Sequence, residues 1–221
     1  MMVAQDLSRV NDGHDMREAE KRRLGDDLEP AYRPTAPGRL HLVQKFVNSW
    51  NHEFPAEWDR LGSPERARDW LVRWELLEPE VTLTEAERLR LVRLREALHA
   101  LANANREGAE IPKVLISVLD REGAAASRFR FDRVGEMRLE PVAPGVDGSI
   151  ARLLTIVYHA QLAKTFVRLK GCRQCGWAFY DRSKNRSGNW CSMSICGNRT
   201  KNRAYRRRKS ELGDDEDDLT D

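Results

Sequence analysis

Long apolar runs and cysteines are both scarce in this sequence of 221 residues. No stretch approaches the roughly 18 consecutive apolar residues that a membrane-spanning helix needs, so we expect no membrane span. Residues 1–27 also lack an apolar segment of the roughly 7 to 15 residues found in secretory signals. We therefore expect a cytoplasmic protein, and that compartment disfavours disulfide bonds.

Spacings typical of common catalytic sites are absent as well. The sequence contains no HExxH pattern, no Gly-x-Ser-x-Gly elbow and no glycine-rich phosphate loop. Its five histidines are scattered, and a packed or exposed structural role is the simplest interpretation of each. These histidines are His14, His41, His52, His99 and His159. We therefore expect a protein that is not an enzyme.

All four cysteines lie in one short stretch near the carboxyl end. They are Cys172, Cys175, Cys191 and Cys196, spaced as C-x2-C, fifteen residues and C-x4-C. This spacing brings four thiolates within reach of one tetrahedral ion, so we predict one structural Zn²⁺. Four sulfur ligands leave no open position for a catalytic water. The alternatives are two disulfides, which the expected compartment disfavours, and four unrelated thiols.

The residues around the cysteines predict a knuckle, a hairpin and a helix. Segments 177–180 and 189–190 have the composition of short strands, and the polar segment 181–188 separates them. Ser192 is a candidate cap for a helix that continues through Lys209. So small a module buries little apolar surface, and metal binding should therefore supply much of its folding free energy.

Several motifs in this stretch resemble those of the CGNR zinc finger family. They are Cys172-x-x-Cys175-Gly-Trp-x-Phe179, Asp181, Asn185-Arg186, Trp190-Cys191-Ser-Met193 and Cys196-Gly197-Asn198-Arg199, followed by Lys201, Tyr205 and Arg207. The preceding part, chiefly residues 42–49, is similar to the ABATE domain of stress-induced bacterial transcription regulators. The resemblance implies a DNA-binding regulator.

Apolar periodicity before the cysteines predicts a mainly helical domain. Residues 40–50 carry an apolar stripe at helical spacing. Ser63-Pro64 begins a second helix, and Thr84 with Glu87 forms a capping box for a long third helix that ends at Gly108. Residues 111–119 could form another short helix.

Two further segments complete this domain. Residues 128–132 and 137–141 alternate in polarity and predict a β-hairpin whose first strand has one wet face. Residues 150–169 predict a last helix that leads straight into the zinc module. Such a helix either transmits a change between the two domains or acts as a rigid spacer.

The predicted fold class is thus mainly α with a small β-hairpin (α+β), in which a helical domain precedes a small treble-clef-like zinc module. We predict a disordered tail at residues 1–38, an ABATE-like domain at 39–169, a CGNR-type zinc finger at 170–209 and an acidic disordered tail at 210–221. Four tryptophans of the helical domain either line a pocket for a small-molecule effector or belong to the core. They are Trp50, Trp58, Trp70 and Trp74.

Charge is strongly segregated along the chain, although the net charge is only +3. Residues 164–209 contain fourteen Lys and Arg and one acid, whereas residues 211–221 contain seven acids and no base. The basic segment indicates a polyanionic partner. The acidic tail is either a solubility tail or an intramolecular competitor for the basic helix.

The arrangement of the basic residues predicts double-stranded DNA as that partner. Four arginines of the predicted final helix lie within about 100° of one another around the helix axis. These are Arg199, Arg203, Arg206 and Arg207. Lys184 and Arg186 on the preceding loop would hold a second stretch of backbone, and Lys201 would also act in positioning. Asn198 and Asn202 would either read adenine edges or serve as caps, and Arg203 could contact guanine.

We therefore predict a zinc-dependent, DNA-binding transcription regulator with this helix in the major groove. One such module covers few base pairs, so a homodimer or a neighbouring factor is expected. The alternative is a structural RNA-binding or ribosome-associated zinc protein, and a third interpretation is protein binding through the finger. RNA recognition usually needs exposed aromatic rings, of which Tyr180 and Tyr205 are the candidates outside the metal site.

Overall fold

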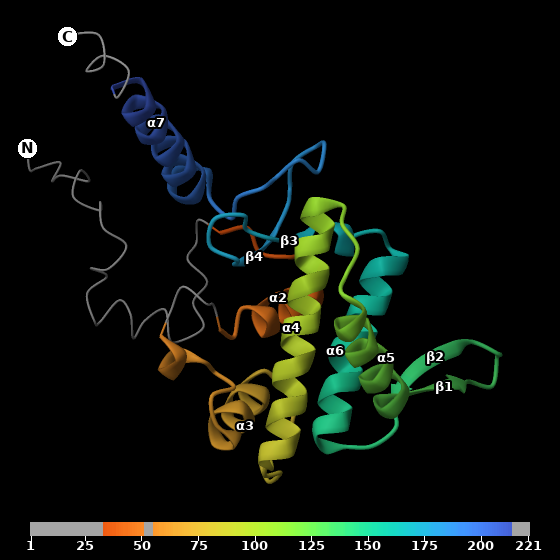
Figure 1. Cartoon of the computed structure of the whole chain (residues 1–221). Helices are drawn as coiled ribbons and strands as arrows, with labels where there is room; N and C mark the ends of the chain where they lie inside the picture. The colour runs from red at the N-terminus through yellow and green to blue at the C-terminus, as the bar shows by residue number, and fades with distance from the viewer. Residues whose placement is uncertain (1–32, 51–54, 214–221) are drawn as a thin grey trace, which may run out of the picture. The chain divides into compact units, whose positions relative to one another are not determined.

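A computed structural model describes residues 33–50 and 55–213 of the chain (Figure 1). The predicted tails at residues 1–38 and 210–221 therefore lie largely outside the described residues. The described part contains six α-helices, four strands and three short helical turns, and its fold is mainly α with two small antiparallel hairpins, as predicted. In the order of the chain the elements are α2 (Leu40–Val47), η1 (Ala56–Trp58), α3 (Pro64–Arg73), α4 (Glu85–Glu107), α5 (Lys113–Ala126), β1 (Ser127–Phe131), β2 (Met137–Pro141), α6 (Gly145–Leu162), η2 (Phe166–Arg168), β3 (Leu169–Gly171), β4 (Ala178–Tyr180), η3 (Met193–Gly197) and α7 (Asn198–Gly213).

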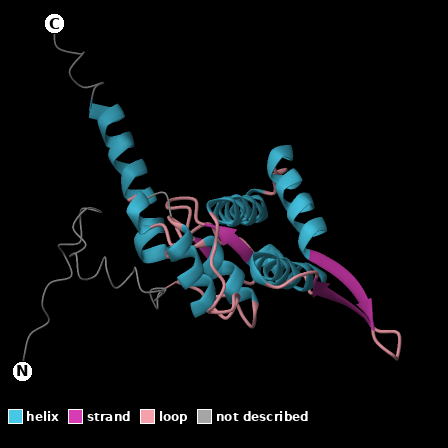
Figure 2. Cartoon of the chain, turned by 90° about the horizontal axis from the view of Figure 1, so that it is seen from below, coloured by secondary structure: helices cyan, strands magenta, loops and turns pink. Residues whose placement is uncertain are grey.

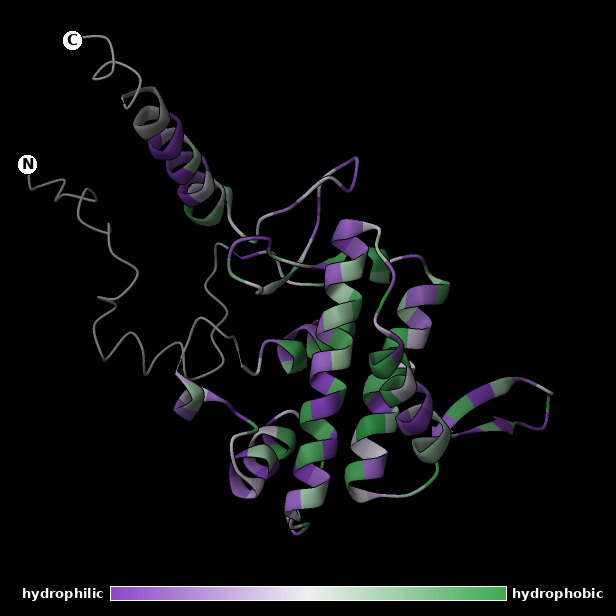
Figure 3. Ribbon diagram, viewed as in Figure 1, coloured by the Kyte–Doolittle hydropathy of each residue, from purple (hydrophilic) through white to green (hydrophobic). Residues whose placement is uncertain are grey.

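Helix α4 is the central element of the helical domain. It packs against α2, α3 and α5, and α6 packs against α2 and α5 (Figure 1). Hydrophobic positions lie on the facing sides of these helices (Figure 3). Several large apolar side chains of this core are fully buried. They include Phe46, Leu71, Leu91, Leu94, Leu98, Ile150 and Leu153. Among the described helices, none is long and apolar enough to cross a membrane.

The predicted helix boundaries that depend on caps are confirmed. The Ser63 hydroxyl accepts a hydrogen bond from the Arg66 amide at 3.3 Å, at the start of α3. The Thr84 and Glu87 side chains form the reciprocal capping box that begins α4. Gly108 ends α4 in the left-handed conformation, with φ of 65°. Helix α5 is also present, but it is longer than predicted and runs to Ala126.

The tryptophans of the helical domain are partly core residues. Trp70 is buried and its ring lies 5.7 Å from that of Phe46 and 6.2 Å from that of Trp74. Trp50 and Trp58 are half-buried. The core interpretation therefore holds for Trp70, the most deeply packed of the four.

The predicted hairpin forms between β1 and β2, with Phe129 opposite Leu139 and Phe131 opposite Met137. The prediction that its first strand has one wet face is wrong. Phe129 and Phe131 are 61% and 68% exposed, so both faces of the strand are wet. Figure 2 shows this hairpin continuing beyond the end of α5, away from the helices. Alternation of polarity indicated a strand but could not show whether another layer covers the apolar face.

The predicted continuous helix into the zinc module is wrong. Helix α6 ends at Leu162, and Lys164 has φ of 55°, which reverses the chain. The turn η2 and strand β3 follow, so the two domains are not joined by one helix. Leu169 continues the apolar period of the helix in sequence, and this periodicity concealed the break.

The second hairpin also differs from the prediction. Strand β4 confirms the strand predicted at 177–180, but residues 189–190 form no strand. Its partner is β3, with Leu169 opposite Tyr180 and Gly171 opposite Ala178. The hairpin turn is therefore the first cysteine knuckle itself, where the Cys172 amide donates to the Trp177 carbonyl at 2.9 Å. Residues 181–188 lie beyond the hairpin as a separate loop.

Residues 33–38 contact the zinc module, although they fall in the predicted tail. The Pro34 carbonyl accepts a hydrogen bond from the Tyr180 amide of β4 at 3.0 Å. The Arg33 guanidinium lies 4.3 Å from the centre of the Trp177 ring, and Ala36 is buried. The proline-rich composition predicted no core contact there, because these contacts are made with residues far along the chain.

Candidate metal centre and nucleic-acid interface

The four predicted cysteine ligands lie together. Their sulfur atoms are all within 4.8 Å of one another, and three of the sulfur–sulfur distances are 3.6, 3.6 and 3.7 Å. Zinc–sulfur bonds of about 2.3 Å place the corners of a tetrahedron about 3.8 Å apart, so these distances suit one zinc ion. Disulfide sulfurs would be about 2.05 Å apart, and none of the four cysteines forms a disulfide. One structural Zn²⁺ is the cofactor that this site binds.

Local structure holds each sulfur in place. Cys172 and Cys175 flank a tight turn in which the Gly176 amide donates to the Cys172 carbonyl at 2.8 Å. Gly176 has φ of 72°, a conformation that glycine adopts without strain. Cys196 lies in the short turn η3, whose first amide groups are capped by the Ser192 hydroxyl accepting from Ile195 at 3.3 Å. Ser192 is therefore a cap, as predicted, although one π-helical turn precedes α7.

The surroundings of the sulfurs favour a cation. All four cysteines are buried, with Phe179, Trp177, Trp190 and Ile195 packed around them. Four thiolates in so small a volume therefore require a positive ion, and a bound divalent metal deprotonates its thiol ligands. The aromatic rings exclude water from this centre.

The zinc module is docked on the helical domain through polar side chains. The Asn48 amide nitrogen donates to the Ala178 carbonyl at 2.8 Å, and the Asn48 amide oxygen accepts from the Ala178 amide at 2.8 Å. Gln44 donates to the same carbonyl at 3.1 Å, and Asn105 donates to the Phe166 and Leu169 carbonyls at 2.9 Å. The His99 Nε2 atom lies 2.6 Å from the Gly176 carbonyl oxygen. We call Gln44, Asn48, His99 and Asn105 the docking residues.

Sequence reasoning missed the docking residues. A signal was present, because Gln44 and Asn48 interrupt the apolar stripe of the first helix and lie one turn apart. Polar groups on a buried face need hydrogen-bond partners, and here those partners are backbone groups of β4. The connection predicted through a continuous helix is instead made by side chains of α2 and α4.

The residues predicted to contact nucleic acid are exposed. Asn198, Arg199 and all residues from Lys201 to Arg208 lie on the exposed surface of α7, and Lys184 and Arg186 are exposed on the loop 181–188. Hydrophilic positions predominate in the coloured part of α7 (Figure 3). Its first turn is tied to the metal centre, because the Thr200 hydroxyl donates to the Gln174 side chain at 3.0 Å. The basic helix begins at Asn198, two residues after the fourth zinc ligand Cys196.

One cation of the basic segment 164–209, Lys170, is not available to a partner. Lys170 is 3% exposed and its ammonium lies 2.8 Å from the Asp181 carboxylate. Burial alone would raise the pKa of Asp181, but hydrogen bonds from Lys170, Ser183 and Gly188 outweigh it and lower the pKa to about 2. The carboxylate is thus ionised at neutral pH. The sequence count of basic residues overstates the exposed charge, because Lys170 is used internally.

Two family models match the chain. Residues 40–164 match the family described as "Putative stress-induced transcription regulator" (ABATE), and residues 168–209 match the CGNR zinc finger. The chain belongs to the ABATE family. Its helical domain is the ABATE domain and its metal module is the CGNR zinc finger, in the predicted order. No curated protein matches the chain. The two families and the four-cysteine cluster together indicate a zinc-binding regulator.

Proposed function

We propose that this protein is a transcription regulator that binds double-stranded DNA through α7 and depends on zinc to do so. The observation that carries the proposal is the exposure and charge of α7. All eight side chains from Lys201 to Arg208 are exposed, five of them are basic and none is acidic. A short helix without an apolar face gains no stability from packing. A polyanionic partner would neutralise its charges and stabilise it.

The geometry of α7 suits the major groove, which is wide enough to admit one α-helix. Arg199, Arg203 and Arg206 recur at helical spacing and form one basic stripe together with Arg207. In this proposal Arg203 and the amides of Asn198 and Asn202 contact base edges, while the other basic residues, Lys201 included, contact phosphates. The zinc ion does not touch DNA. It holds the start of the helix through Cys196.

RNA binding is less well supported by the arrangement of the aromatic rings. Trp177, Phe179 and Trp190 pack around the sulfurs and Tyr180 is buried. Tyr205 is 62% exposed and is the ring on α7 that could stack on a base. The proposal includes no catalytic step, because four cysteine ligands leave no open position on the metal.

The proposal is tested with the full-length, zinc-loaded protein and a pool of random duplex DNA. We expect reproducible enrichment of one short motif, and a motif with twofold symmetry would indicate that two copies bind together. Contact with about five phosphates predicts that log K falls with log salt concentration at a slope of about −4 to −5. Structured RNA should compete weakly. Removal of zinc by a chelator should abolish binding.

Matched variants locate the contact. Arg199→Ala with Arg206→Ala should reduce the steepness of the salt slope by about 2, since each phosphate contact contributes about 1. The control replaces Arg93 and Arg133, which are also exposed but lie in α4 and the β1–β2 turn, and it should leave the slope unchanged. Binding that is insensitive to salt between about 50 and 200 mM, or that survives chelation, would contradict the proposal.

A further inference from the structure

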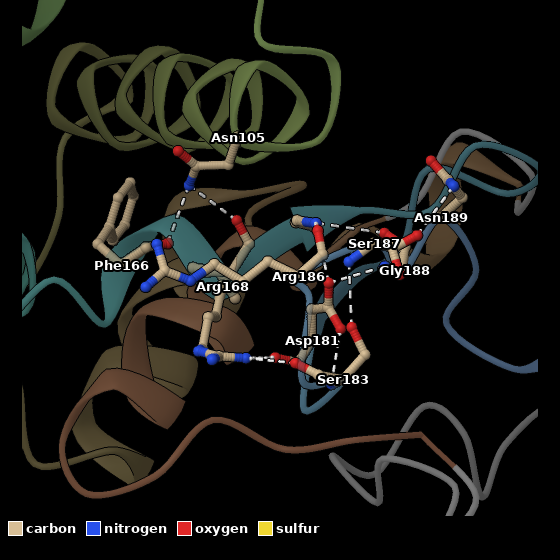
Figure 4. Close-up of polar contacts among 11 residues, drawn as sticks. Asn105, Phe166, Arg168, Asp181, Ser183, Arg186, Ser187, Gly188 and Asn189 are labelled. Atoms are coloured by element: carbon tan, nitrogen blue, oxygen red, sulfur yellow. Dashed lines mark hydrogen bonds and ion pairs between the residues drawn. The ribbon is translucent and has the colours of Figure 1, made fainter.

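The loop 181–188, which we call the basic loop, is held from beneath by a buried ion pair. Lys170 and Asp181 are both 3% exposed, and the Lys170 ammonium also donates to the carbonyls of Arg186 and Gly188. The Asp181 carboxylate accepts from the amides of Ser183 at 2.9 Å and Gly188 at 2.8 Å. Both ends of the loop are thus bonded to one carboxylate (Figure 4).

Further hydrogen bonds fix the loop at its other points. Arg168 donates to the carbonyls of Asp181 at 3.0 Å and Ser183 at 2.8 Å. The Ser187 amide donates to the Ser183 hydroxyl at 3.1 Å. A side chain at position 188 would put its Cβ 2.8 Å from the Asp181 carboxyl carbon, so glycine is required there. These hydrogen bonds leave the backbone of the loop little freedom.

Arg186 at the tip of this loop has an unfavourable backbone conformation. Its φ of 53° is in the left-handed region, which residues with a Cβ atom rarely adopt. The Lys170 ammonium holds the Arg186 carbonyl and so maintains this conformation, while the Arg186 side chain is exposed. Glycine would adopt the same backbone without strain. Backbone strain that the surroundings maintain clusters at functional sites, and here it coincides with an exposed basic side chain.

We propose that Lys170 and Asp181 are positioning residues for nucleic-acid binding, and that they hold the basic loop so that Arg186 and Lys184 each contact a DNA phosphate group. This inference rests on the function proposed above. It adds a second contact to α7, and it explains why two charges of the finger are buried rather than exposed. A preorganised loop loses less conformational entropy on binding than a free one.

The first test compares Arg186→Gly with Arg133→Gly, which removes an exposed arginine from the β1–β2 turn. Affinity for duplex DNA is measured against salt, and melting temperature and bound zinc are measured on the same full-length samples. Arg186→Gly should melt at the same or a higher temperature, since it removes strain. It should weaken binding about eightfold at 0.1 M salt, which corresponds to the loss of one phosphate contact. Arg133→Gly should leave the affinity unchanged.

The second test asks whether the ion pair acts through the loop. Removing one partner alone leaves the other charge buried and unpaired, so both are replaced in Lys170→Met with Asp181→Asn. In the wild type, replacing Lys184 and Arg186 together by alanine should cost about 60-fold in affinity at 0.1 M salt, from two lost contacts. In the ion-pair variant, with zinc retained, the same replacement should cost less than about tenfold.

Each outcome decides the matter. A wild-type protein that binds no duplex DNA overturns the proposed function and this inference together. If the wild type binds DNA and Arg186→Gly binds equally well, the contact assigned to Arg186 is overturned while the function of α7 stands. An equal loss on replacing Lys184 and Arg186 in both backgrounds overturns the positioning role of the ion pair. A lower melting temperature and loss of zinc in Arg186→Gly would make Arg186 a structural residue and also overturn the inference.

Discussion

The helical domain and the zinc finger of this protein are held together by different interactions. In the helical domain, large apolar side chains such as Leu94, Leu98 and Ile150 are completely buried, and each contributes about 1.5–3 kcal/mol to the free energy of unfolding. In the zinc finger, the buried centre consists of four cysteines and Phe179, with three partly buried apolar side chains around it. The difference shows that a unit too small for an apolar core depends on its metal.

The contact between the helical domain and the zinc finger depends on a third kind of interaction. It is made by amide side chains that pair with backbone groups of β4, as an additional strand would, rather than by apolar packing alone. Hydrogen bonds of this kind are directional, so they fix how the finger sits on α2 and α4. The finger therefore takes its internal stability from zinc and its orientation from the helical domain.

Loss of zinc should produce the largest difference in stability between the zinc finger and the helical domain. Chelation, or Cys191→Ser, should unfold residues 172–177 and 181–197 while α4 and α6 remain helical, because the core of these helices contains no metal ligand. Structural zinc sites contribute about 10–16 kcal/mol of apparent binding free energy. Hydrogen exchange measured along the chain, with zinc added back as the control, should show loss of protection confined to the finger. Simultaneous unfolding of α4 would contradict the separation of the two cores.

A cavity in the helical core should have the next largest effect. Leu98→Ala should lower the free energy of unfolding by about 2–5 kcal/mol, since Leu98 is fully buried. Urea denaturation of the zinc-loaded protein measures this change. Leu89→Ala is the control on the same helix, and its cost should be below about 1 kcal/mol because Leu89 is 38% exposed. Zinc content should be normal in both variants, and loss of zinc from Leu98→Ala would show that the metal centre depends on the helical core.

Removing the docking residue Asn48 should lower stability less, and it should affect both the helical domain and the zinc finger. Asn48→Ala leaves the Ala178 amide without its partner and should cost about 1–3 kcal/mol. Thermal denaturation followed by the helical signal measures this cost, and hydrogen exchange of β4 locates it. Asn185→Ala, on the exposed surface of the basic loop, is the matched control and should cost less than about 0.5 kcal/mol. Equal melting temperatures of Asn48→Ala and the wild type would contradict a docking role.

The smallest expected effect is that of a helix cap. Thr84→Ala should cost about 1 kcal/mol, because the Glu87 amide loses its acceptor at the start of α4. Thr82→Ala, two residues earlier and also exposed, should change the melting temperature little. The zinc affinity should be the same in both variants. A changed zinc affinity would show that the two regions are coupled more tightly than their separate cores indicate.

Features that depend on neighbours in sequence could be predicted well. The capping box of Thr84 and Glu87, the proline-initiated helix after Ser63 and the end of α4 at Gly108 all depend on residues within one helical turn. The metal ligands could be predicted because a knuckle and a short helical turn each place two cysteines close together, whatever the rest of the chain does. The basic stripe of α7 follows from helical periodicity alone.

Features that depend on distant partners could not be predicted in this way. Strand β4 could be recognised by composition, but its partner β3 could not, because Leu169 also fitted the preceding helix. The burial of Lys170 became evident only when Asp181 was found beside it. Phe129 and Phe131 alternate as in a half-buried strand, yet both are exposed.

The sequence by itself determined the zinc site, the helix boundaries marked by caps, and the charge and periodicity of α7, because each arises from interactions over a few residues. The tertiary structure alone decided where α6 ends, which strand pairs with β4, how the docking residues hold the finger, and which cations of the basic segment remain exposed. Those outcomes depend on hydrogen bonds between residues as far apart as Asn48 and Ala178. Such hydrogen bonds form only when the whole domain packs, so a local sequence pattern does not predict them.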